Sequence, residues 1–77
     1  MATFEIHNKR TGFKDVKTVI NPYDAEIMYV KAVSELVDMD ISGDINPLTD
    51  MILFWTVDGR KQGRCIVKNG RVEVKTR

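Results

Sequence analysis

Few residues in this sequence could carry acid–base or thiol chemistry. His7 is the single histidine and stands two residues after Glu5, so the two side chains could share a proton on one side of a strand. Cys65 is the single cysteine, which excludes an internal disulfide and a cysteine-based zinc cage. Strand alternation directs Cys65 inward and its neighbour Arg64 outward, so we expect a structural thiol. These residues predict no catalytic site and no cofactor.

An acidic segment after the predicted helix spaces its oxygen atoms as a metal-binding loop does. Oxygen side chains alternate before a glycine in the run Asp38, Met39, Asp40, Ile41, Ser42 and Gly43. This order resembles the first half of an EF-hand-type calcium loop. The twelfth position is Thr49 rather than a bidentate glutamate, and a strand is expected to follow. We therefore interpret Asp38–Asp50 as a solvated connection with no tightly held metal ion.

The positions of polar and apolar residues predict five strands and one helix. Alternation and turn residues place strands at residues 3–7, 13–20, 51–57, 62–68 and 71–75. Asn21 and Pro22 are typical of a helix start, and the helix is expected to reach about Val37. The order is ββαβββ, which predicts a single α+β domain over residues 1–77. Its antiparallel sheet is covered on one face by the helix.

The predicted helix is apolar around much of its circumference. Its apolar residues span roughly 220° of arc, whereas a surface helix needs about 100° to cover a core. Asp24, Lys31, Glu35 and Asp38 form the narrow polar remainder. Either a curved sheet cradles the helix, or part of its apolar face meets a partner.

Two short turns predict the register of the C-terminal strands. Asp58-Gly59 and Asn69-Gly70 are typical two-residue hairpin turns. Counting outward from them places Ile52 and Phe54 in the helix-covered core with Cys65. The opposite face then combines apolar and cationic side chains in one candidate binding site: Leu53, Trp55, Arg64, Lys68, Arg71 and Lys75.

The distribution of charge points to a binding protein. The net charge of +1 conceals segments of +2 over residues 1–20, −7 over residues 21–58 and +6 over residues 59–77. Exposed Trp55 beside cations favours protein contact, as in a small bacterial or phage regulator or inhibitor. The alternative is nucleic-acid binding by the basic sheet face. Separate acidic and basic regions would also permit self-association.

The sequence also predicts where the protein acts. No apolar run approaches the roughly 18 residues of a membrane span. The first residues lack the charged-then-apolar layout of a signal peptide. We therefore expect a cytoplasmic, non-enzymatic binding module that does not contact a membrane.

Overall fold

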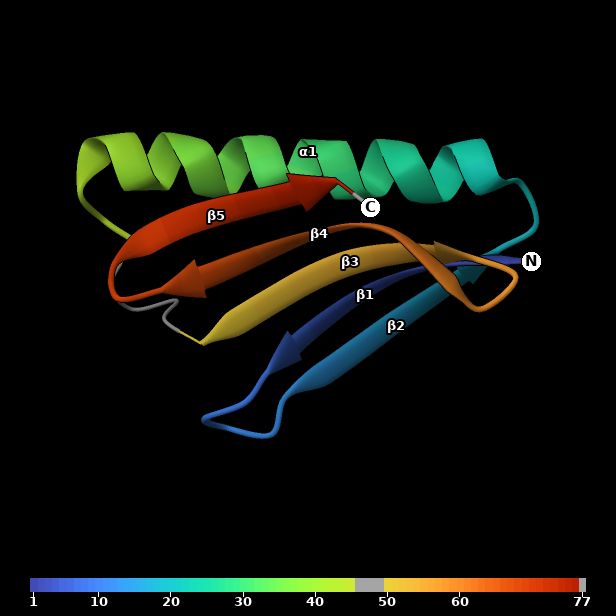
Figure 1. Ribbon diagram of the computed structural model, residues 1–77, viewed down its shortest axis with the longest axis horizontal. Helices are drawn as coiled ribbons and strands as arrows, with labels where there is room; N and C mark the ends of the chain where they lie inside the picture. Colours follow the sequence, from blue (N-terminus) through green and yellow to red (C-terminus); the bar gives the residue numbers. More distant parts are fainter. Residues whose placement is uncertain (46–49, 77) are drawn as a thin grey trace.

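Five strands and one helix make up the part of the chain that the computed structural model describes, residues 1–45 and 50–76 (Figure 1). Their bounds are β1 (Ala2–Asn8), β2 (Lys14–Val19), α1 (Pro22–Ser42), β3 (Met51–Val57), β4 (Arg60–Lys68) and β5 (Arg71–Thr76). The strands form one antiparallel sheet in the order β2-β1-β3-β4-β5. The helix lies against one face of this sheet. The predicted α+β class and element order are confirmed.

The helix α1 begins as the sequence predicts. The Asn21 side chain accepts a hydrogen bond of 2.9 Å from the backbone N–H of Tyr23, and Pro22 takes the first helical position. This cap satisfies one of the N–H groups that a helix start leaves without a partner inside the helix.

The helix ends later than expected, so the prediction that it stops near Val37 is wrong. It continues to Ser42, because Gly43 is the first residue to adopt the left-handed conformation (φ 82°) that closes a helix. The Asp40 carboxylate then accepts a 3.3 Å hydrogen bond from the backbone N–H of Val72, which ties the last turns of α1 to β5.

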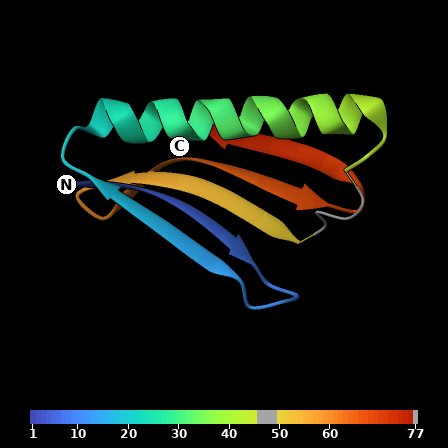
Figure 2. The same ribbon diagram turned by 180° about the vertical axis from the view of Figure 1, so that it is seen from behind.

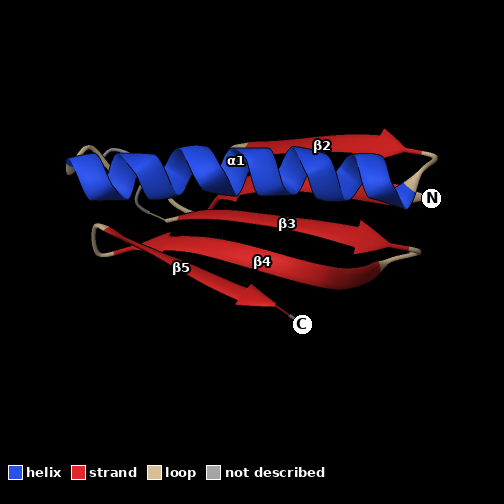
Figure 3. Ribbon diagram, turned by 90° about the horizontal axis from the view of Figure 1, so that it is seen from above, coloured by secondary structure: helices blue, strands red, loops and turns tan. Residues whose placement is uncertain are grey.

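The core lies between α1 and the sheet. Its buried members come from the helix, the three central strands and the segment after the helix: Phe4, Tyr29, Leu36, Ile45, Leu53, Cys65 and Val67. In the view from above, α1 lies toward the β2 and β1 side of the sheet, and β5 forms the opposite edge (Figure 3). Within the described residues, no element covers the outer side of α1 or the far side of the sheet (Figures 1 and 2).

A β-bulge in the β3–β4 hairpin sets which side chains enter this core. Beyond the Asp58-Gly59 turn, Thr56 pairs with Lys61, but Trp55 then pairs with Gly63, so Gln62 is an extra residue on β4. The bulge places the Trp55 indole against Gly63. A side chain at Gly63 would bring its Cβ within 3.3 Å of the indole nitrogen and 3.6 Å of the Tyr29 ring. The bulge thus depends on a residue without a side chain.

We expect Gly63→Val to lower the free energy of unfolding by about 1–3 kcal/mol, the usual range for overpacking a core. The valine would press on the Trp55 indole and the Tyr29 ring. Urea unfolding followed by circular dichroism measures the effect. Arg64→Val is the control, because it adds valine at the next residue of the same strand, where the side chain is exposed. Equal stability of the two variants would contradict the close packing at Gly63.

Candidate functional site

The structure corrects the face assigned to two residues of the sequence-predicted site. Leu53 is 2% exposed and belongs to the core beneath α1, and Trp55 is half-buried against that core. The physical reason is the bulge at Gln62, because a one-residue shift of register moves every side chain of a strand to the opposite face. Ile52 and Phe54, expected in the core, lie on the other side of the sheet.

The four predicted cations do share a face. Arg64 pairs with Lys75 and Lys68 with Arg71, the register predicted from the Asn69-Gly70 turn. They belong to the open face, the side of the sheet away from α1. By strand alternation from the buried residues, this face carries Thr3, Glu5, His7, Lys14, Val16, Thr18, Ile52, Phe54, Thr56, Lys61, Arg64, Ile66, Lys68, Arg71, Glu73 and Lys75. Its six cations against two carboxylates make it strongly basic.

Phe54 occupies the centre of the open face but is largely covered. Lys61 Nζ lies 4.6 Å from the centre of the Phe54 ring, and the His7 ring lies 5.1 Å from it on another side. The ring is therefore only 8% exposed. A cation over an aromatic ring is a favourable contact, and the long lysine stem shields apolar surface that the sheet would otherwise expose.

The His7–Glu5 pair forms as the sequence suggested. His7 Nε2 lies 3.0 Å from Glu5 Oε1, and Thr3 Oγ1 donates to Glu5 Oε2 at 3.0 Å. Burial by itself would raise the pKa of the Glu5 carboxyl, but the hydrogen bonds from His7 and Thr3 and the charge of nearby Lys14 lower it below its usual value. A carboxylate that stays ionised and bonded in this way anchors His7 on the sheet.

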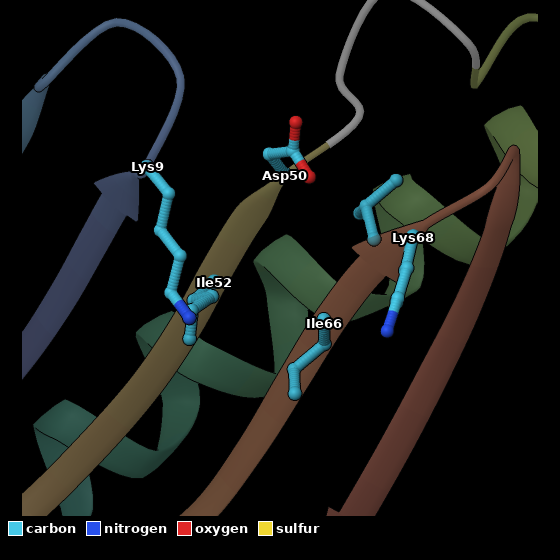
Figure 4. Close-up of a pocket in the computed structure, with 6 residues that line it drawn as sticks. Lys9, Asp50, Ile52, Ile66 and Lys68 are labelled. Atoms are coloured by element: carbon cyan, nitrogen blue, oxygen red, sulfur yellow. The ribbon is translucent and has the colours of Figure 1, made fainter.

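One end of the open face is hollowed. A depression of about 320 Å³ is lined by Lys9, Asp50, Ile52, Ile66, Val67 and Lys68. Figure 4 shows the two isoleucines side by side on β3 and β4, with Lys9 extending over β3 toward Ile52. Asp50 also lies 3.6 Å from the Arg10 guanidinium, measured from Oδ2 to Nε. The hollow therefore joins an apolar floor to a mainly cationic rim.

The acidic segment does not form the loop that its spacing suggested. Asp38, Asp40 and Ser42 lie in the last turns of α1, where the Ser42 hydroxyl bonds to the Asp38 carbonyl at 2.9 Å. Asn46 and Thr49, the later positions of that motif, lie outside the described residues. Among the described residues, no group of three or more acidic, histidine or cysteine side chains is placed to hold a metal ion.

A second surface lies on the outer side of α1, where the sequence left open a contact with a partner but named no site residues. Large apolar side chains repeat there at intervals of three and four residues, and we call this set the outer stripe: Tyr23, Ile27, Val30, Val37 and Ile41, with Ser34 between the valines. All of these apolar members are exposed, Tyr23 by 64% and Ile41 by 81%. Ile20, just before the helix, is 87% exposed and extends the same spacing. The excess apolar arc in the sequence was the signal for this surface.

Comparison of the chain with protein-family models, with curated proteins and with solved structures finds no match. In the part of the chain that the structure describes, no helix combines the length and the apolar character that crossing a membrane requires.

Cys65 is predicted to be structural. It is fully buried, and burial raises the pKa of its thiol to about 11, so the reactive thiolate is scarce in the folded protein. Labelling with a thiol reagent at pH 8 should therefore be slow until urea unfolds the chain. Cys65→Ser should lower the free energy of unfolding by about 1–3 kcal/mol, because it places a hydroxyl in an apolar site. Rapid labelling of the folded protein would contradict this role.

Proposed function

We propose that the protein is a small non-enzymatic binding module that acts by protein contact, and that its contact surface is the outer stripe of α1. The supporting observation is the concentration of exposed apolar groups on this helix. Of ten large exposed apolar side chains among the described residues, six lie between residues 20 and 41 at the stripe spacing. Contiguous apolar surface of this kind is typical of a protein contact rather than of a solvated face.

The biological setting in this proposal is that of a cytoplasmic regulator or inhibitor of bacterial or phage origin. Small size and a single thiol support that setting. The partner would recognise a continuous helical ridge.

We expect Val30→Lys to weaken the protein contact about thirty-fold, which corresponds to about 2 kcal/mol, because it places a charge at the centre of an apolar seam. The measurement is capture by the immobilised protein from a native lysate, made before and after nuclease digestion of the lysate. Capture of a different protein and capture of another copy of this chain would each count as a protein contact. Glu35→Lys is the matched control, since it adds the same side chain elsewhere on the helix surface. Capture that survives Val30→Lys, or that disappears on nuclease digestion, would contradict the proposal.

A second candidate function is nucleic-acid binding by the open face. It is favoured by the excess of cations on an uncovered sheet, since cations neutralise phosphates and release bound counterions. The coverage of Phe54 by Lys61 limits base stacking, so the support for this candidate is electrostatic.

If the open face binds single-stranded DNA, the logarithm of affinity should fall linearly with the logarithm of salt concentration. Arg64→Ala or Lys68→Ala should each reduce that slope by about 0.7, the value of one phosphate contact. Fluorescence anisotropy of a labelled oligonucleotide measures both quantities. Lys31→Ala, which removes a cation from α1, is the control and should leave the slope unchanged. A slope unaffected by the sheet variants would exclude this binding surface.

A further inference from the structure

The outer stripe has the alternating three- and four-residue spacing of a coiled-coil seam. In heptad notation, Ile27, Ser34 and Ile41 fall at a positions, and Tyr23, Val30 and Val37 at d positions. Ser34 is the single polar residue at an a position, and a polar residue placed there can fix the register in which such helices pair. We propose that the stripe binds a second copy of this chain, with the two helices parallel and in register. This inference rests on the proposal that the stripe is the contact surface.

The surface of α1 already contains the depressions that such a pair needs. In a coiled coil, each a or d side chain enters a hole between four residues of the facing helix. A hollow of about 410 Å³ on α1 is lined by Tyr23, Glu26, Ile27, Val30, Lys31 and Ser34. These six residues form two overlapping holes of four. In a parallel pair, Ile27 and Val30 of the second copy would enter them.

The charges that flank the stripe select the parallel arrangement. Glu26 is at a g position and Lys31 at the e position five residues later, so parallel helices bring Glu26 of each copy beside Lys31 of the other. An antiparallel pair centred on the stripe would bring Asp24 near Asp38, Glu26 near Asp40, and the two Lys31 side chains together. Every charged pair at the flanks is attractive in the first arrangement and repulsive in the second.

The position of the stripe allows this pairing without contact between the two sheets. The sheet lies on the opposite side of α1, so the two sheets would lie on the far sides of the helix pair (Figures 1 and 2). The 21 residues of α1 give a seam about 31 Å long at 1.5 Å per residue. A single seam of this length is a small contact, so we expect a weak dimer with a dissociation constant in the micromolar range or above.

Disulfide trapping tests the direction of the two helices. Ile41→Cys should form a disulfide-linked dimer under mild oxidation, because in-register parallel helices bring the two new thiols together. In the antiparallel pair, residue 41 faces residue 23, and the two thiols lie about 27 Å apart, too far for a disulfide. Ser42→Cys is the matched control, since it points about 100° away from the seam. Cys65 is fully buried, so it should not form a competing disulfide. Equal linkage of the two variants would overturn the parallel arrangement.

Charge exchange gives an independent test by sedimentation equilibrium at low salt. Glu26→Lys and Lys31→Glu should each weaken the dimer, by about three- to ten-fold, because each places like charges side by side. The double variant Glu26→Lys with Lys31→Glu should restore the original affinity. Antiparallel pairing predicts the opposite sign for Glu26→Lys, because the new lysine would face Asp40. Thermal melts of the single variants confirm that they fold.

The result separates the dimer from the proposed function. A chain that stays monomeric up to about 1 mM, while Val30→Lys still abolishes capture of a different protein, would overturn self-pairing and leave the proposed contact surface intact. A chain that stays monomeric, with capture unaffected by Val30→Lys, would overturn both. Self-association that is restored by the double charge exchange would support both.

Discussion

The pairing of Trp55 with Gly63 aligns the core-facing side of β4, and with it that of β5, with the core-facing side of β3. On β1, Phe4 and Ile6 face the helix and are opposite Trp55 and Leu53 of β3, so β1 fixes the inward side of β3. The bulge at Gln62 then shifts the register of β4, so that Cys65 pairs with Leu53 and faces the helix as well. Without it, the Asp58-Gly59 turn would place Arg64 opposite Leu53, beneath the helix. Burying an unpaired guanidinium there would cost far more than the local break in the strand ladder that the bulge introduces.

The two outer surfaces of the molecule carry opposite charge. The helix holds five carboxylates and one lysine, whereas the open face holds six cations and two carboxylates. The two faces also manage apolar surface differently. On the open face, the stem of Lys61 covers the Phe54 ring and shields it from solvent, so no second apolar layer is needed there. On α1, nothing among the described residues covers the outer stripe. The apolar excess of the chain is therefore concentrated on the helix, which is why we place the protein contact there.

The sequence was sufficient for the architecture and for the C-terminal hairpin. The Asn69-Gly70 turn and clear alternation on β5 gave the observed pairs, such as Val67 with Val72. It was insufficient for β3, whose run Met51–Val57 is apolar on both faces, so alternation could not show which side is buried. Counting from the Asp58-Gly59 turn then gave the wrong side, because a bulge has no strong signature in composition. Only the nearby Gly63 hints at it.

The end of the helix was mispredicted for a related reason. Aspartate and serine after Val37 are typical of loops, because their side chains compete for backbone hydrogen bonds. In the structure, Met39 packs against the core and Asp40 bonds to β5, and these tertiary contacts extend the helix to the first glycine. Those last turns carry Ile41, the final member of the outer stripe. A helix ending at Val37 would have shown a stripe too short to distinguish from scattered surface residues.

The geometry also bears on how the two candidate surfaces could act in one molecule. The outer stripe and the open face lie on opposite sides of the fold, so a contact through α1 leaves the cations of the sheet accessible. A pair of chains joined through their helices would present two basic faces pointing away from each other. Such a pair could hold two anionic segments at once, or two stretches of one long polyanion, and the second contact would gain from the effective concentration set by the first. Weak association through α1 and weak electrostatic binding by the sheet would then strengthen each other, although neither surface touches the other.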